Sequence, residues 1–373
     1  MVNLEIARRR LHNQHITRRE IETPQKLVEW LGAVQAQDFA GAKWALGLRL
    51  HAVTDEDIEQ AFNDGAILRT HVLRPTWHFV SPADIRWLLA LTAPRVQQAM
   101  AFYNRKNELD EAAFHRTNAV LAQALQGGKQ LTRDELAAAL REAGITTDGE
   151  QRVTFIMMQA ELDGVICSGA RRGKQFTYAL LAERAPQART LPRDEALAEL
   201  TTRYFRSHGP ATAQDFAWWS GLTLGDVKAG LALTASRLSQ ETIEGQTYWF
   251  SPATPSSPSL QNTAQTAHLL PDYDEYTVGY TDRNAIFDAA HTGKLDPRGG
   301  LLMNTMALDG QIVGDWKRTF KKNSVVLAAN PFVTLGAAET RLFAAAANRY
   351  AEFLQMPVDS PFADASQSIL EGE

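Results

Sequence analysis

The stretch that decides the fold is Thr132-Arg-Asp-Glu-Leu-Ala-Ala-Ala-Leu-Arg-Glu-Ala-Gly144, followed by Val153-Thr-Phe-Ile-Met-Met-Gln-Ala-Glu-Leu162 and then by Val165-Ile-Cys167 and Phe176-Thr-Tyr-Ala-Leu-Leu181. The first two segments repeat apolar residues at helical spacing, with a threonine as N-cap and a glycine at the end of the first helix. The last two segments read as strands joined by a loop rich in glycine and basic residues. Helix, helix, strand, basic loop and strand in this order predict a winged helix over residues 130–182.

The same order recurs on both sides of this stretch. Residues 194–250 contain two helices separated by a Ser220-Gly221-Leu222 turn, then two strands around the tight turn Glu244-Gly245-Gln246. Residues 24–80 are a more degenerate copy, with helices expected from Pro24, over 38–50 and after Thr54, and strands at 67–72 and 76–80. The three copies together predict three tandem winged-helix modules.

The C-terminal third has a different sequence pattern, with a linker followed by β-like segments. Residues 251–264 are rich in proline and serine and are expected to form a linker. Residues 265–335 contain β-like runs, among them 301–308 and 311–316, with Asp309-Gly310 as a hairpin turn. A helix is expected over 336–354, and an acidic, frayed tail over 360–373. The fold class is therefore α+β, three winged-helix modules plus a β-barrel, with domains at 1–128, 129–190, 191–255 and 265–359.

Composition excludes several classes of protein. The chain has 373 residues, of which 45% are hydrophobic and 22% charged, and no apolar run is long enough to span a membrane. The basic residues near the N-terminus precede no apolar segment of the kind a secretory signal needs. The single Cys167 excludes an intramolecular disulfide and cysteine-rich metal sites. We expect a cytoplasmic, nucleoid-associated monomer without a metal or cofactor.

Charge is unevenly distributed along the chain. The net charge of −5 argues mildly against a protein that only coats nucleic acid, but the local potential decides binding. Basic residues cluster between Arg8 and Arg19, in Arg171-Arg172-Gly173-Lys174, and from Lys317 to Lys322. Each cluster is either a surface for DNA or simply a solvated face.

The candidate catalytic motif is Gln35-Ala36-Gln37, expected between the end of one helix and the start of the next. The spacing alone carries almost no information, because two polar residues beside a helix junction are usually caps or surface groups. P-loop, Gly-x-Ser-x-Gly and His-Glu-x-x-His motifs do not occur.

Four segments resemble the winged-helix family of AlkZ-like DNA glycosylases: 31–38, which holds the motif, 69–80, 269–283 and 309–318. The resemblance runs from about residue 5 to residue 355. It implies a C-shaped clamp around duplex DNA and removal of alkylated purines, including crosslinks, without a lyase step. The family's Gln-Φ-Gln motif maps onto Gln35 and Gln37 as catalytic residues, with Ala36 smaller than the usual aliphatic residue.

The chemistry of the lesion explains how two amides could suffice. A purine alkylated at N7 or N3 is cationic and is already a good leaving group, so a strong general acid is unnecessary. What remains is to hold a water beneath C1′, which amide oxygens and hydrogens can do.

Further residues are expected around this motif. The possible cleft residues are Asp38, Asp274, Glu275 and Asp282, and Asp38 is also a competing candidate for a general base. Capping, turn and ion-pair roles are open alternatives. Trp77, Trp218, Trp219 and Trp249 are expected in the core, with a wedge role for Trp77 as the alternative. Contacts with the DNA backbone are expected from Lys43, Arg69, Arg74, His78, Arg171, Arg172 and Lys174.

Two other functions remain open from sequence alone. Repeated winged helices also occur in transcriptional regulators, which bind DNA without catalysis. A protein-interaction scaffold is the second alternative, although the basic loop at 171–174 speaks against it.

Overall fold

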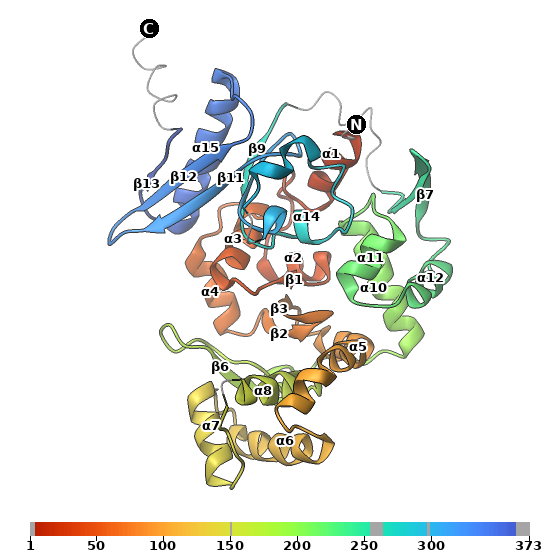
Figure 1. The fold of residues 1–373 in the computed structure, drawn as a ribbon, viewed down its shortest axis with the longest axis vertical. Coiled ribbons are helices and arrows are strands. Elements are labelled where there is room, and N and C mark those ends of the chain that lie inside the picture. The colour runs from red at the N-terminus through yellow and green to blue at the C-terminus, as the bar shows by residue number, and fades with distance from the viewer. Residues whose placement is uncertain (1–3, 150, 254–263, 297–298, 363–373) are drawn as a thin grey trace.

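The computed structural model describes residues 4–149, 151–253, 264–296 and 299–362. The molecule is elongated and α+β. Figure 1 shows the C-terminal sheet at the upper end, the helices of residues 111–162 at the lower end, and the first sheet between them. No helix in the described ranges is both long and apolar enough to cross a bilayer.

The N-terminal part contains the first helices and the first sheet. Its elements are α1 (Leu4–Asn13), α2 (Pro24–Leu31), β1 (Val34–Gln35), α3 (Phe39–Arg49), α4 (Asp55–Asn63), β2 (Leu68–Val72) and β3 (Arg74–Val80). The strands form an antiparallel sheet in the order β1-β3-β2. The predicted start of α4 is confirmed, because Thr54 and Asp57 form a capping box. Helix α1 was not predicted.

The second helix–helix–hairpin unit is present as predicted, after two long linking helices. The elements are α5 (Ile85–Lys106), α6 (Glu111–Leu125), β4 (Leu131–Thr132), α7 (Arg133–Glu142), α8 (Arg152–Leu162), β5 (Ile166–Ser168) and β6 (Thr177–Leu180). The sheet order is β4-β6-β5. Thr132 caps α7 and forms a capping box with Glu135, as its position in the sequence indicated.

A third such unit follows. It comprises α9 (Leu181–Arg184), α10 (Arg193–Ser207), α11 (Ala213–Ser220), α12 (Leu224–Leu233), β7 (Ser239–Ile243) and β8 (Gln246–Phe250). Glu244 and Gly245 both have positive φ, 51° and 81°, which is the two-residue turn that the sequence predicted. Gly221 ends α11 with φ 68°, and a Cβ there would lie 2.1 Å from the carbonyl oxygen of Leu73. This glycine lets α11 approach the β2–β3 turn closely.

The C-terminal part is a five-stranded sheet, curled into a half-barrel, with one long helix. Its elements are β9 (Ala267–Leu270), α14 (Glu275–Val278), η1 (Ala289–Lys294), η2 (Gly300–Leu302), β10 (Thr305–Leu308), β11 (Gln311–Phe320), β12 (Val325–Pro331), α15 (Ala337–Leu354) and β13 (Val358–Asp359). The order β13-β12-β11-β10-β9 leaves the sheet open, so the prediction of a barrel was right only for a partial one. The Asp309-Gly310 turn is confirmed, whereas residues 301–302 form a 3-10 turn instead of a strand.

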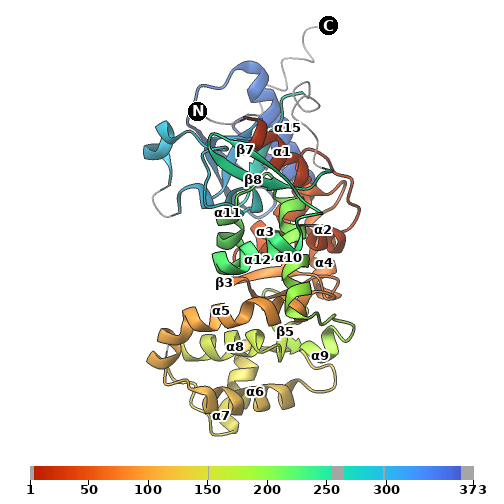
Figure 2. The same cartoon turned by 90° about the vertical axis from the view of Figure 1, so that its right-hand side faces the viewer.

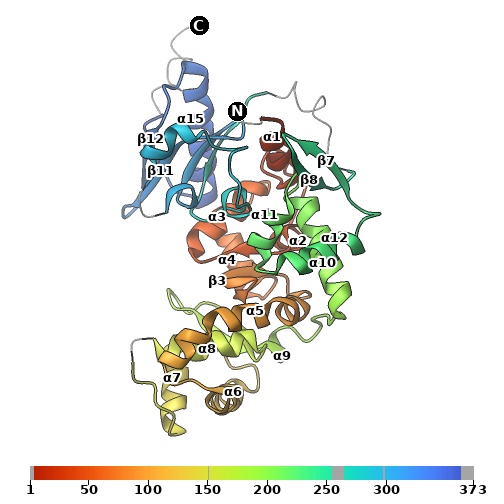
Figure 3. The same ribbon diagram turned by 45° about the vertical axis from the view of Figure 1, so that its right-hand side comes forward.

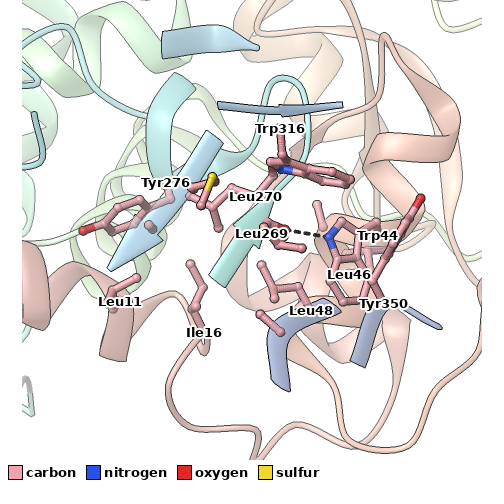
Figure 4. Close-up of a cluster of buried hydrophobic side chains, with 14 of the residues drawn as sticks. Leu11, Ile16, Trp44, Leu46, Leu48, Leu269, Leu270, Tyr276, Trp316 and Tyr350 are labelled. Atoms are coloured by element: carbon pink, nitrogen blue, oxygen red, sulfur yellow. Dashed lines mark hydrogen bonds between the residues drawn. The ribbon is translucent and has the colours of Figure 1, made fainter. Parts of the chain in front are cut away.

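One hydrophobic core joins the N-terminal helices to this sheet. Trp44 of α3 packs edge-on against Tyr350 of α15, which also contacts Trp316 of β11 (Figure 4). The indole N–H of Trp44 donates to the carbonyl of Leu269, at 2.7 Å, and Trp316 donates to that of Leu270, at 2.8 Å. Because buried tryptophan donors need a partner, these bonds fix β9 against α3 and against β11.

The basic cluster at the N-terminus belongs to this packing. Arg8 pairs with Asp309 and Arg9 with Glu241, while the buried Arg10 lies 3.6 Å from the ring centre of Tyr280. These arginines are therefore neither a solvated face nor a free surface for nucleic acid. They attach α1 to the third unit and to the C-terminal sheet.

Candidate active site

The motif Gln35-Ala36-Gln37 lies in and after β1, at the edge of the first sheet. Gln35 is opposite His78 of β3, and the Ala36 N–H donates to the carbonyl of Trp77, at 2.7 Å. The prediction of a helix junction was therefore incomplete, because a short strand separates α2 from α3. Gly32 ends α2 with φ 86°, and Val34 and Ala36 then fill the core as the chain extends.

Gln35 is the buried end of the motif, with 6% of its surface exposed. Its backbone N–H donates to Oε1 of Glu275, at 2.7 Å, and its side-chain Oε1 accepts from Nη2 of Arg74, at 2.8 Å. Since an arginine can only donate, the amide oxygen of Gln35 must face it. The NH₂ group of Gln35 is therefore turned away from Arg74.

Glu275, the first residue of α14, accepts a hydrogen bond from the backbone of the motif. It is fully buried and also accepts from the indole N–H of Trp219, at 2.8 Å, and faces Nε2 of His208 at 3.3 Å. Burial alone would raise the pKa of Glu275, but hydrogen bonds from His208 and the Gln35 N–H and the charge of Arg74 lower it to about 2. The carboxylate is ionised throughout the neutral range.

Arg74 connects three parts of the chain at this point. Besides Gln35 it donates to the carbonyl of Trp219, at 2.5 Å, at the end of α11. Burial lowers the pKa of Arg74, and the nearby Glu275 carboxylate opposes that shift. The motif is thus fixed where the first sheet, α11 and α14 meet.

Gln37 is the exposed end of the motif. Among the described residues, the one hydrogen bond of its side-chain oxygen is a long one, 3.4 Å, from the backbone N–H of Trp77. Such a bond is weak, so the amide can turn toward a ligand at little cost.

The guanidinium of Arg69 and the rings of Trp77 and Phe176 pack together next to the motif. The guanidinium of Arg69 lies 4.2 Å from the ring centre of Trp77 and 4.6 Å from that of Phe176, and its Nε donates to the carbonyl of Ala36, at 3.0 Å. His71 packs on Trp77, at 4.4 Å between ring centres. Arg69 is only 8% exposed and supports the motif, and its contact with DNA stays a prediction.

His78 is also buried, with no exposed surface. Burial, together with the charge of Arg74, lowers the pKa of His78 to about 3. Nδ1 donates to the carbonyl of Thr76, at 2.9 Å, because a carbonyl can only accept. Nε2 is then an unprotonated acceptor without a partner among the described residues. His78 is thus neutral and buried in this structure, and its contact with DNA stays a prediction.

Of the remaining basic candidates, Lys43 and Arg171 lie beside Phe39, at 5.4 Å and 5.1 Å from its ring centre. Lys43 is 4% exposed, and its ammonium pairs with Asp55 and Glu59, both at 2.6 Å. In the loop between β5 and β6, Arg171 pairs with Glu59 at 3.3 Å and Arg172 with Glu135 at 2.7 Å. Lys174 is exposed and has no ion pair within the described ranges.

The acidic candidates are engaged in structural contacts. Asp274 is fully buried, forms an ion pair with Arg49 at 2.7 Å and caps α14. Asp38 precedes α3 but makes no capping hydrogen bond, and instead accepts from Arg318, at 2.9 Å. Asp282 accepts from the Asn284 N–H and forms no ion pair with Arg283 among the residues described.

Two contacts of Glu275 were missed by sequence reasoning. One is with His208, which follows α10, and the other is with Trp219 of α11. No pattern marked either residue as a neighbour of the motif.

The tryptophan predictions have mixed outcomes. The prediction that Trp219 is in the core is confirmed, whereas Trp218 is 45% exposed and that prediction was wrong. Trp77 and Trp249 are half-buried. Within the described ranges, no three His, Cys, Asp or Glu side chains gather as they would around a metal ion.

Comparisons with known proteins agree with this geometry. The family model "DNA glycosylase AlkZ-like" matches residues 28–353. An interstrand DNA cross-link repair glycosylase from Streptomyces sahachiroi is 24% identical over 320 residues, which are 83% of this chain and 85% of that protein. The solved structure of Streptomyces sahachiroi DNA glycosylase AlkZ superposes with a TM-score of 0.78 and 22% identity, covering 96% of this chain and 100% of that one. The chain therefore belongs to the AlkZ-like DNA glycosylase family.

Proposed function

We propose that the protein is a monofunctional DNA glycosylase that hydrolyses the N-glycosidic bond of purines made cationic by alkylation at N7 or N3. The observation that carries this proposal is the unequal setting of the two glutamines, one anchored by Glu275 and Arg74 and the other exposed beside it. An anchored strand that ends in a free amide is suited to hold a water in a fixed place.

In the proposed reaction a water oxygen bonds to C1′ while the C1′–N bond breaks. The bonding electrons leave with the base and neutralise its positive charge, and the water gives up one proton to solvent. Gln37 orients the water, and Gln35 holds the strand and presents its NH₂ group. Positioning of this kind can lower the barrier by several kcal/mol, and an undamaged base remains a poor leaving group.

The absence of a lyase step is part of the proposal. A lyase needs an amine that forms a Schiff base with the sugar. In the described structure the groups that contact residues 35–37 are a carboxylate, guanidinium groups and backbone amides or carbonyls, none of which is an amine nucleophile.

We further propose how the fold serves this reaction. The three helix–helix–hairpin units, at 1–128, 129–190 and 191–255, act as winged-helix modules that form a C-shaped clamp with the half-barrel of 265–359. The sheet orders β1-β3-β2 and β4-β6-β5, each beside two helices, support this assignment. The clamp binds duplex DNA as a monomer.

Interstrand crosslinks are proposed as additional substrates. The relative from Streptomyces sahachiroi is named for crosslink repair. Ala36 is fully buried, so its small side chain changes the packing under the motif and does not touch the lesion itself.

The test uses two duplexes that differ only in one base, 7-methylguanine or guanine. We expect release of 7-methylguanine alone and an abasic site that breaks only after alkali treatment. Strand breakage without alkali would contradict the monofunctional assignment. Binding without release from several alkylated duplexes would favour the non-enzymatic regulator.

A further inference from the structure

Helix α5 stands out from the rest of this acidic chain by its charge. Its 22 residues include Arg86, Arg95, Arg105 and Lys106 and no aspartate or glutamate. The whole protein, by contrast, carries a net charge of −5. The helix itself therefore carries four positive charges, while Asp84 precedes it and Glu108, Asp110 and Glu111 follow it.

Three exposed residues of α5 form one stripe. Arg95, Phe102 and Lys106 are separated by seven and four residues, a spacing that places them on the same side of a helix. All three are exposed, and Phe102 retains 63% of its surface. A large aromatic side chain between two cations at the surface indicates a binding face.

The side of α5 opposite the stripe packs against α8. Val96 and Met100 contact Met158 and Leu162 of α8, so the stripe lies on the side away from α8. Figures 2 and 3 show α5 between β3 and α8, with its C-terminal half extending beyond β3. Helix α5 thus lies next to β3, the strand that pairs with the motif.

The charges of the stripe are not neutralised. Arg95 donates to Gln98, and neither Arg105 nor Lys106 has a carboxylate within ion-pair distance in the described ranges. The arginines of the β5–β6 loop, by contrast, are paired with Glu59 and Glu135. The cations of α5 can therefore bind an external anion without first breaking an ion pair.

We propose that the stripe Arg95–Phe102–Lys106, with the adjacent Arg105, binds the sugar-phosphate backbone of duplex DNA. The inference rests on the proposed function for its choice of partner. The stripe is about 16 Å long, since each helical residue advances about 1.5 Å, which suits contacts with successive phosphates better than with a single small anion. Phe102 packs against the sugars between the phosphate contacts.

The test is binding of an undamaged duplex to the full chain as a function of salt. Arg95→Ala/Lys106→Ala should weaken binding at least tenfold at low salt. The slope of log K against log salt should fall by about 1.8, since each lost phosphate contact removes about 0.9. Phe102→Ala should weaken binding threefold or more with the slope unchanged, because it removes no charge.

The matched control is Arg116→Ala/Arg341→Ala, on α6 and α15, which removes the same charge from exposed positions. It should change affinity less than twofold. Equal losses in the two double variants, or an unchanged slope in the α5 variant, would overturn the proposal. Preference for anionic vesicles or an acidic peptide over duplex DNA would also overturn it. Because the duplex is undamaged, the result does not depend on whether base release occurs.

Discussion

The two ends of the Gln-Ala-Gln motif lie two residues apart and have opposite environments. Gln35 is buried and bound through both its backbone and its side chain, whereas Gln37 is exposed and makes one long hydrogen bond. One end is therefore held by the framework, and we propose that the other, which the fold holds only weakly, acts on the substrate. Changes at the buried end should affect stability first, and changes at the exposed end should affect activity alone.

The largest loss of stability is expected for Glu275→Ala. The substitution leaves the Gln35 N–H and the Trp219 indole N–H buried without an acceptor and removes the carboxylate near Arg74. We expect the free energy of unfolding to fall by about 3–5 kcal/mol, since each buried unpaired donor costs about 1–3 kcal/mol. Urea unfolding measures this change in the free energy of unfolding. Glu22→Ala at the surface is the control and should leave the midpoint unchanged.

A smaller effect is expected for Arg74→Met, which keeps the aliphatic stem but loses the donors. The Gln35 amide and the Trp219 carbonyl lose a partner, so stability should fall by about 2 kcal/mol. Base release should slow about tenfold because the strand is less well fixed. If Gln37 alone carried the active-site role, the rate of base release would stay normal in Arg74→Met. Single-turnover kinetics, compared at the same fraction of folded protein, distinguish a slower rate from a normal one.

Acid should destabilise the buried end through His78. Its pKa is about 3 in the folded protein, against 6.5 for the free side chain. A lowered histidine pKa means that stability is complete above pH 6.5 and is lost as the pH falls from there toward 3, because only the unfolded chain takes up the proton. At pH 5.5 the protein should have lost about 1.4 kcal/mol of its free energy of unfolding relative to neutral pH. His78→Gln should remove that part of the pH dependence in unfolding curves, and an unchanged curve would show that His78 titrates normally.

The smallest effect is expected at the exposed ion pair of Arg172 with Glu135. Exposed pairs are screened by water and contribute little. Arg172→Ala should leave the unfolding midpoint unchanged within error, and a clear shift would mean that the β5–β6 loop is part of the framework.

Local signals in the sequence predicted much of this architecture. Thr54 and Thr132 cap their helices, and Asp309-Gly310 and Glu244-Gly245 form the turns that were expected. These features depend on neighbours in the chain.

Contacts between distant segments could not be predicted in this way. His208 reaches Glu275 across 67 residues, and Arg8 reaches Asp309 across 301. The basic residues of the β5–β6 loop suggested a DNA surface, but only the fold reveals that Glu59 and Glu135 neutralise two of them. Neither the acid-free helix α5 nor its exposed stripe was predicted.

The most direct measurement compares Gln37→Ala with wild type for release of 7-methylguanine under single-turnover conditions, with thermal unfolding recorded on the same samples. We expect the rate to fall about 100-fold, which corresponds to about 2.7 kcal/mol of barrier, while the unfolding midpoint and the affinity for DNA stay the same. Wild-type rates in Gln37→Ala, or a loss of activity that follows a loss of stability, would contradict the assignment of Gln37 as the working end of the motif.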